Sequence, residues 1–226
     1  MWWGDGNSDI ITTYNQANVT HTYASAGVYN LVIDGTLYGF RFNNGGDRLK
    51  LIDITQWGNM RLGNSNGYFY GCSNFNSTAT DVLDLTGTTT MQGMFGSATS
   101  FNSSIIWDVS SVTNMQQMFN FATSFNQNIS SWNVSSVTTM QWMFWSATSF
   151  NQNISSWDVS KVITTYEMFS SATSFNQNII GWNCSKVTTM QGMFSSATSF
   201  NSSIIWNVSS VTNMQGMFGG ATSFNQ

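Results

Sequence analysis

Large apolar residues return at a fixed spacing over most of the chain. The tryptophans stand at Trp107, Trp132, Trp157, Trp182 and Trp206, and the phenylalanines at Phe101, Phe125, Phe150, Phe175, Phe200 and Phe224. The repeating unit of 24 or 25 residues reads FNQNISSWDVSSVTTMQxMFxxATS, and weaker copies extend back to Trp57. Because a fixed period of this length is typical of stacked repeats, the pattern predicts a solenoid of about seven repeats over residues 47–226.

The two halves of each repeat have different patterns. The Met-x-x-Met-Phe spacing, as in Met140, Met143 and Phe144, places three large apolar side chains on one face of a short helix. Thr138 and Gln141 have the spacing of a capping box at the start of that helix. The other half, Phe-Asn-Gln-Asn-Ile-Ser-Ser-Trp, alternates apolar and polar residues as a short strand does. The sequence therefore predicts one short β-strand and one short helix per repeat.

One repeat departs from this pattern. Ile163 and Thr165 stand where Thr and Met are expected, and Thr164 and Glu167 have capping-box spacing one position later. The sequence therefore predicts a shifted helix start in this repeat.

Equivalent positions of successive repeats should form columns along the stack. A single repeat buries too little apolar surface to fold alone, so like residues are expected to lie above like residues. The Met, Phe and Trp columns are expected to point inward. A polar column holds Asn102, Asn126, Asn151, Asn176, Asn201 and Asn225. Because an amide both donates and accepts hydrogen bonds, we expect this column to satisfy backbone groups or its own members.

The first 46 residues have a different pattern. Asn43-Asn44-Gly45-Gly46 is typical of a loop and marks the expected boundary between residues 1–46 and 47–226. The alternation from Val28 to Ile33, and a Gly-Asp-Gly turn after the first tryptophans, predict antiparallel strands. We expect a partial antiparallel β-sandwich in residues 1–46.

Composition narrows the classes of function. The 226 residues are 41% apolar and 15% aromatic, which is enough core-forming material for a folded chain. Only 7% are charged, and the net charge of −4 gives no basic surface for nucleic acid or anionic membranes. No apolar run approaches the ~18 residues of a membrane span. We expect no nucleic-acid partner and no membrane insertion.

Residues for catalysis or metal binding are scarce. His21 is the single histidine and lies in a predicted strand, so we interpret it as a structural residue and not as the histidine of a catalytic triad. Asp5 and Asp9 could hold calcium, but a solvated turn is the favoured interpretation. Asp108 and Asp158 share a column, as paired carboxylates for glycoside chemistry would, yet an exposed column is not a pocket. We expect no enzymatic activity, no cofactor and no metal.

The two cysteines occupy columns of small apolar residues. Cys72 stands in an alanine column and Cys184 in a valine column, about four repeats apart. That separation is roughly 19 Å along a stack, whereas a disulfide needs Cα atoms within about 7 Å. Both are expected to be buried free thiols.

Four aromatic residues interrupt columns that hold small or polar residues elsewhere. They are Phe121, Trp142, Trp145 and Tyr166. On neighbouring repeats they would cover about 10–15 Å, a footprint suited to stacking on a sugar or to anchoring a protein partner. The alternative is that they pack against residues 1–46, a neighbouring subunit or one another.

The repeats resemble those of a known family. The motif V-T-x-M-x-x-M-F-x-x-A-x-x-F-N-Q-x-I-x-x-W-D, together with Phe69-Tyr70-Gly71-Cys72-Ser73, is similar to the BspA-like leucine-rich-repeat surface proteins. This resemblance implies a leucine-rich-repeat-like, right-handed solenoid on a bacterial or viral surface. No leucine follows Leu85, so other apolar residues would fill the columns. Trp3-Gly4-Asp5-Gly6 and the stretch from His21 to Val32 resemble the latter half of a PKD domain, an immunoglobulin-like β-sandwich.

Two functions are compatible with these observations. The first is a non-enzymatic surface adhesion module that binds a host surface protein, a glycan or neighbouring cells through a rigid solenoid face. The alternative is a structural protein, a rod or spacer of an extracellular filament, sheath or virion appendage. The expected location is extracellular, at the cell surface or on a virion. The chain stops in mid-repeat at Gln226, so we expect either a longer protein or self-association through open solenoid ends.

Overall fold

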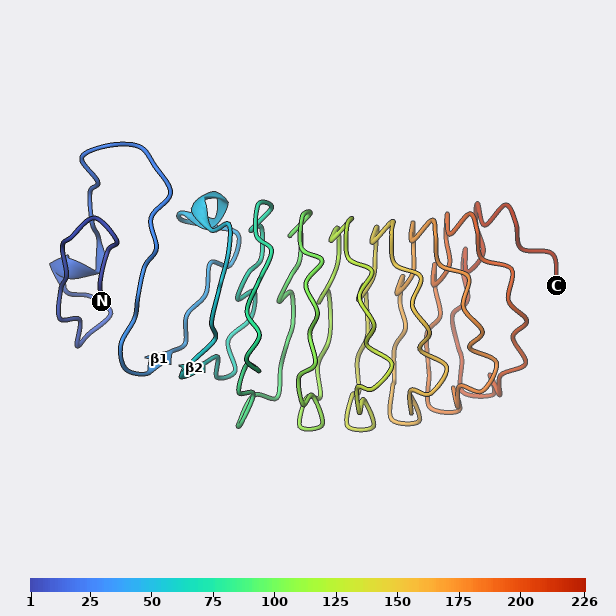
Figure 1. Ribbon diagram of the computed structural model, residues 1–226. Coiled ribbons are helices and arrows are strands. Elements are labelled where there is room, and N and C mark those ends of the chain that lie inside the picture. The colour runs from blue at the N-terminus through green and yellow to red at the C-terminus, as the bar shows by residue number, and fades with distance from the viewer. The chain divides into compact units, whose positions relative to one another are not determined.

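The computed structural model describes residues 1–226, which divide into two compact units, Met1–Leu37 and Tyr38–Gln226. This division falls earlier than the loop at residues 43–46. The regular elements are few and short: the 3₁₀ helices η1 (Ala17–Val19) and η2 (Arg48–Lys50), and the strands β1 (Leu37–Tyr38) and β2 (Met60–Arg61). The two strands form a two-stranded sheet (Figure 1).

Successive repeats of the second unit lie side by side as stacked coils (Figure 1). A ladder of parallel β-bridges joins one residue of each repeat to its equivalent in the next, through Thr90, Asn114, Thr139, Thr164, Thr189 and Asn213. Each pair of bridged residues is one repeat apart in the sequence. Residues of equal position in the repeat are therefore neighbours along the stack.

The Met-x-x-Met-Phe segment forms consecutive turns, so the predicted helix in each repeat is wrong. The N–H of Met143 donates to the carbonyl of Met140 at 3.1 Å and closes a turn. The N–H of Trp142 instead donates to the carbonyl of Tyr166 in the next repeat at 2.9 Å. A helix needs every N–H bonded four residues back along its own chain. Here alternate N–H groups bond to the neighbouring repeat, which excludes that arrangement.

The predicted capping box is also absent. The hydroxyl of Thr138 donates to the backbone carbonyl of Thr113 in the preceding repeat at 3.1 Å, and Gln141 donates its backbone N–H to the hydroxyl of Thr139 at 3.5 Å. The threonine side chain thus joins two repeats. A turn segment without a helix leaves no helix start to cap.

The Phe-Asn-Gln-Asn-Ile segment contains no strand, so the predicted position of the strand is wrong as well. Its backbone bonds to side chains of the asparagine column. The Oδ1 atom of Asn151 accepts from the backbone N–H of Asn176 at 3.0 Å, and Asn126 accepts from Asn151 at 2.9 Å. An N–H that is bonded to a side chain cannot take part in a strand ladder. The expected structural role of the asparagine column is confirmed.

The irregular repeat keeps the register of its neighbours. Thr164 takes the bridge position between Thr139 and Thr189, and Thr165 lies in the methionine column, 2% exposed. The predicted one-residue shift is therefore wrong. A shift would break the bridges to both neighbouring repeats, whereas one threonine in the methionine column leaves them intact.

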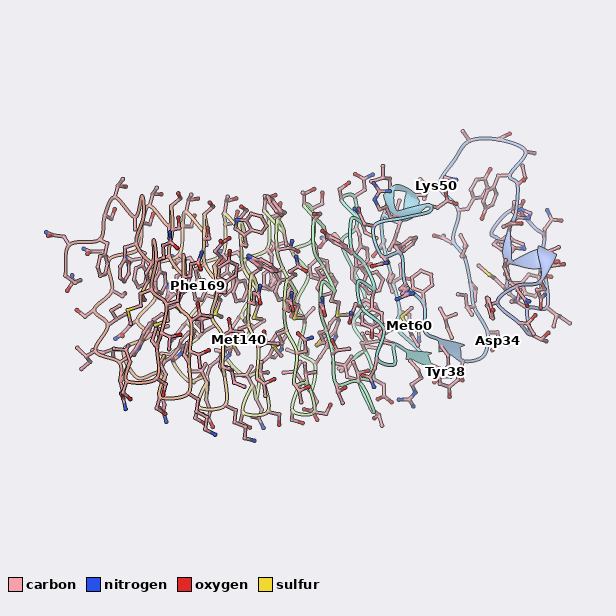
Figure 2. The ribbon with its side chains drawn as sticks, turned by 180° about the vertical axis from the view of Figure 1, so that it is seen from behind. Asp34, Tyr38, Lys50, Met60, Met140 and Phe169 are labelled. Carbon is pink, nitrogen blue, oxygen red and sulfur yellow. The ribbon has the colours of Figure 1, made fainter.

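One apolar core runs through the second unit from Trp57 to Met217. The Met, Phe and Trp columns are buried, as expected, except in the last repeat, where Met214 is 41% exposed; Trp132 is 4% exposed and Met140 is fully buried (Figure 2). The indole Nε1 of Trp132 donates to the carbonyl of Ile105 in the preceding repeat at 3.0 Å. The same bond recurs at Trp157, Trp182 and Trp206. The tryptophan column thus fills the core and satisfies one buried carbonyl in each preceding repeat.

The first unit holds isolated antiparallel bridges. Trp2 pairs with Ser8 on one side and with Val32 on the other. Val28 to Ile33 form no strand, and most of these side chains are exposed, so the strand predicted there is wrong. A segment with alternating apolar and polar residues forms a strand only where it pairs with a neighbouring strand and packs its apolar side chains on a core. In this unit Val32 alone has such a pairing within that stretch.

Candidate functional site

The four aromatic residues expected to form a patch lie together on the turn segments of three adjacent repeats. The ring of Phe121 lies 4.7 Å from that of Trp145, measured between centroids. Trp145 lies 6.4 Å from Trp142, and Trp142 meets Tyr166 edge to face at 5.3 Å. We call Phe121, Trp142, Trp145 and Tyr166 the aromatic patch. Its members contact one another in a continuous chain across the repeats.

The aromatic patch remains accessible to solvent. Phe121 is 39% exposed, and the other three members are partly exposed. Contact among the aromatic residues was one of the alternatives to a binding site. The structure shows that contact together with a surface on which a ligand can still lie.

Two members of the aromatic patch have a backbone conformation that disfavours large side chains. The φ angle is 57° at Trp142 and 55° at Phe121, in the left-handed region. Both residues occupy the third position of a turn closed by an N–H to C=O bond, where a type II turn requires positive φ. Equivalent positions hold Gly93, Gln117, Glu167, Gly192 and Gly216 in the column of Trp142, and Ser97, Ser146, Ser171, Ser196 and Gly220 in the column of Phe121, all with positive φ. A residue other than glycine in this region costs roughly 1–2 kcal/mol of conformational free energy. The backbone conformation therefore does not favour an aromatic residue at either position.

Glu167 belongs to the same surface, and sequence reasoning missed it as part of the site. Its Oε2 atom accepts a hydrogen bond from the indole Nε1 of Trp142 at 3.2 Å. A hydrogen bond to Glu167 is also the main cause that raises the pKa of Tyr166. The sequence did contain an indication of this contact, because Glu167 stands one repeat after Trp142 in the same column. The capping-box prediction placed Glu167 at a helix start and not beside Trp142.

A glycine in the next repeat leaves room for the Glu167 side chain. A Cβ atom added to Gly192 would lie 2.7 Å from Cγ of Glu167, which is closer than two non-bonded carbon atoms approach each other. Glu167 therefore lies between Gly192 on one side and Trp142 on the other. Its carboxylate is held at the edge of the aromatic patch by its surroundings.

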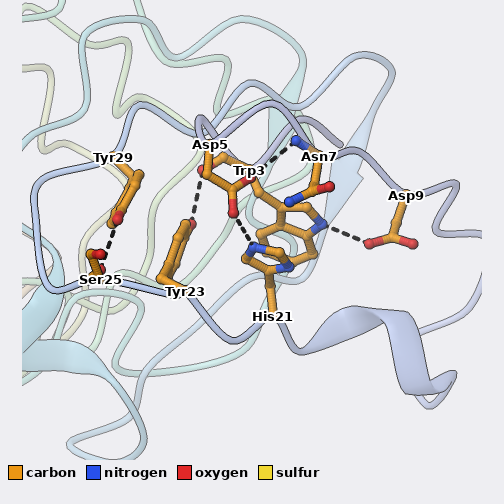
Figure 3. Close-up of polar contacts among 8 residues, drawn as sticks. All are labelled: Trp3, Asp5, Asn7, Asp9, His21, Tyr23, Ser25 and Tyr29. Atoms are coloured by element: carbon orange, nitrogen blue, oxygen red, sulfur yellow. Dashed lines mark hydrogen bonds and ion pairs between the residues drawn. The ribbon is translucent and has the colours of Figure 1, made fainter.

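A second polar cluster lies in the first unit (Figure 3). His21 stacks on Trp3 with ring centroids 4.8 Å apart, and its Nε2 atom lies 2.7 Å from Oδ2 of Asp5. The hydrogen bond with His21 is the largest cause that lowers the pKa of Asp5 to about 2. The indole Nε1 of Trp3 donates to Oδ2 of Asp9 at 2.7 Å, which lowers the pKa of Asp9.

The two carboxylates of this cluster hold parts of the first unit together. Asp5 also accepts from the backbone N–H of Asn7 at 3.0 Å, and Asn18 donates its side-chain amide to Asp9. Each carboxylate has its own set of protein donors. Asp5, Asp9 and His21 thus form contacts within the first unit.

A protein-family model matches the second unit. The family is described as Mycoplasma protein of unknown function, DUF285, and it matches residues 41–134, 63–180 and 167–226. The overlapping matches together cover most of the chain. The chain belongs to the DUF285 family. No curated protein and no solved structure matches it.

The acidic column of this DUF285 chain serves its turns. Asp108 accepts from the backbone N–H of Ser110 and Asp158 from that of Ser160, both at 3.0 Å. Hydrogen bonds from these serines lower the pKa of both carboxyl groups. The amide of Asn133 makes the same contact, so the turn needs an acceptor and no charge. Carboxyl groups with lowered pKa values are poor proton donors near neutral pH, which argues against the general acid of glycoside hydrolysis.

Both cysteines of the DUF285 chain are buried free thiols, as expected. Burial raises the pKa of Cys72 and that of Cys184 to about 12. Since the thiolate is the reactive form, neither thiol is poised for nucleophilic chemistry near neutral pH.

Two further properties of the DUF285 chain concern metals and membranes. Its His, Cys, Asp and Glu side chains form no group of three that could hold a metal ion. None of its helices has the length and apolar character needed to cross a bilayer.

Proposed function

We propose that this DUF285 chain is a non-enzymatic recognition module that attaches to a surface ligand through the aromatic patch. It would act as a BspA-like leucine-rich-repeat surface protein, with the stacked repeats as a rigid solenoid face and residues 1–46 as a PKD-type spacer. Its location would be extracellular, at the cell surface or on a virion.

The observation that carries the proposal is the unbroken chain of contacts among four partly exposed aromatic rings on the turns of three adjacent repeats. Other repeats form the same turns with glycine, serine, glutamine or glutamate, so the turn itself does not explain a large aromatic ring. Exposed tryptophan and tyrosine are also the residues that most often anchor a protein partner or a sugar.

The proposal is tested by replacing Trp142 and Trp145 together with serine. Ser195 occupies the column of Trp145, so serine is compatible with that position. We expect the melting temperature to stay nearly unchanged while attachment to a glycan array or to host cells is lost. Ile106→Ser is the matched control, because Ile106 is 68% exposed on a different segment. Retained attachment together with a fall in stability would show that the aromatic patch only packs.

The alternative function, a rod or spacer of a filament, sheath or virion appendage, predicts association without a ligand. Light scattering of the isolated chain over a range of concentrations separates the two functions. A mass that rises steadily with concentration supports a rod. A constant mass together with ligand-dependent attachment supports a recognition module.

A further inference from the structure

The aromatic patch carries a single carboxylate that has no cationic partner. Glu167 is the only glutamate of the protein and the only acidic residue after Asp158. The ion pairs of the protein are His21–Asp5, Lys50–Asp47 and Arg61–Asp84. Glu167 forms none. Its charge is compensated only by neutral hydrogen-bond donors, of which the Trp142 indole is one.

The faces of the surrounding rings favour the same sign of ligand charge. An aromatic ring has a negative face, and a cation within about 6 Å of the ring centre is attracted to it, most strongly by tryptophan. Trp142 and Tyr166 both form side-chain hydrogen bonds with Glu167. A carboxylate thus lies beside two aromatic rings on a protein whose net charge is already −4. This surface is complementary to a cation.

We propose, on the basis of the proposed function, that the aromatic patch binds an arginine side chain of a protein partner. The guanidinium plane lies on the Trp142 ring and its N–H groups donate to the Glu167 carboxylate. Arginine fits better than lysine because its planar group both stacks on an aromatic face and forms paired hydrogen bonds with a carboxylate. A neutral sugar would use the rings but would leave the charge of Glu167 without a partner.

The placement of Glu167 supports this assignment. Its side chain lies over Gly192, where a Cβ atom would come within 2.7 Å of Cγ, and it is tied to Trp142 by a hydrogen bond. Contacts on both sides limit the freedom of the carboxylate before a ligand arrives. A group that is held in place loses less conformational entropy on binding than a mobile one.

The probe is a short peptide, acetyl-Gly-Arg-Gly-amide, titrated into the full chain at low ionic strength. The indole N–H signal of Trp142, assigned by its loss in Trp142→Phe, reports binding in NMR spectra. We expect a saturable shift that weakens with added salt. The same peptide with citrulline, which is neutral and nearly isosteric with arginine, should bind at least about tenfold more weakly.

Glu167→Gln is the decisive variant, because Gln117 occupies the same column at a similar positive φ of 57°. We expect it to fold normally and to bind the arginine peptide at least about tenfold more weakly. Asp158→Asn is the matched control; it removes one negative charge away from the aromatic patch and should leave binding unchanged. Equal binding of the citrulline peptide, or unchanged binding by Glu167→Gln, would overturn the proposal. A response of Trp142 to a neutral oligosaccharide alone would do the same.

Failure of this inference can be told apart from failure of the proposed function. If Glu167→Gln still attaches to cells while the Trp142 and Trp145 double variant does not, recognition by the aromatic patch stands and the arginine assignment is wrong. If the double variant attaches as well as the unmodified protein, the proposed function itself is wrong.

Discussion

The rings of Phe144 and Phe150 stack within one repeat, with centroids 3.9 Å apart and planes 8° from parallel. Phe144 also stacks on Phe119 of the preceding repeat and on Phe169 of the following one, both at 5.6 Å. Each phenylalanine of this column is thus packed along the stack as well as across it. Removing one ring disturbs three repeats.

Phe144→Ala should therefore destabilise the protein strongly. Phe144 is fully buried, and truncation of a buried phenylalanine typically costs about 3–5 kcal/mol. The free energy of unfolding in urea measures the effect. Phe121→Ala is the matched control, because Phe121 is 39% exposed, and it should cost less than about 1 kcal/mol. A loss below about 1 kcal/mol for Phe144→Ala would contradict its place in the core.

The asparagine column predicts a difference between two substitutions of Asn151. Its Oδ1 atom accepts from the backbone N–H of Asn176 at 3.0 Å and from Nε2 of Gln177 at 2.8 Å. Asn151→Ala removes the acceptor and should cost about 1–3 kcal/mol, because the Asn176 N–H loses its partner. Asn151→Asp keeps an acceptor there and should cost less.

Hydrogen exchange of the Asn176 amide gives a local measurement of the same contact. Protection should fall in Asn151→Ala and persist in Asn151→Asp. Equal protection in both variants would show that the asparagine side chain is not what holds this amide.

The two thiols should be unreactive in the folded protein. Burial raises the pKa of both Cys72 and Cys184 to about 12, so little thiolate exists at pH 8. Iodoacetamide at that pH should leave the native protein unlabelled, as read from its mass. After denaturation without a reductant, two labels are expected. A denatured chain that takes up no label would reveal a disulfide and refute the free thiols.

The first unit should lose stability in acid through Asp5. Its pKa is lowered from 3.8 to about 2 in the folded state, so on acidification the unfolded chain binds the proton first. The stabilisation is fully present above pH 4 and is lost as the pH falls towards 2. The amide of Asn7, which donates to Oδ1 of Asp5, reports the change in NMR spectra. Asp5→Asn should diminish this transition, and the remainder belongs to Asp9, whose pKa is also lowered. An unchanged transition would show that Asp5 does not cause it.

The sequence by itself determined which residues face inward and which positions are equivalent. The common period of tryptophan, phenylalanine and methionine is enough to place Trp132 and Phe144 in the core, because apolar residues in register can be buried together only when repeats stack. The same alignment identified Trp142 and Trp145 as departures from their columns. Their proximity in space then follows from the period alone.

The tertiary structure decided the backbone conformation and the partners of polar groups. The spacing of Met140, Met143 and Phe144 fits a helical face and a series of turns equally well. The turns form because the N–H of Trp142 bonds to the next repeat, and that acceptor exists only in the folded stack. The contact between Trp142 and Glu167 has the same origin. Local sequence patterns determine what a segment can bury, whereas hydrogen bonds between residues about 25 positions apart determine the shape it takes.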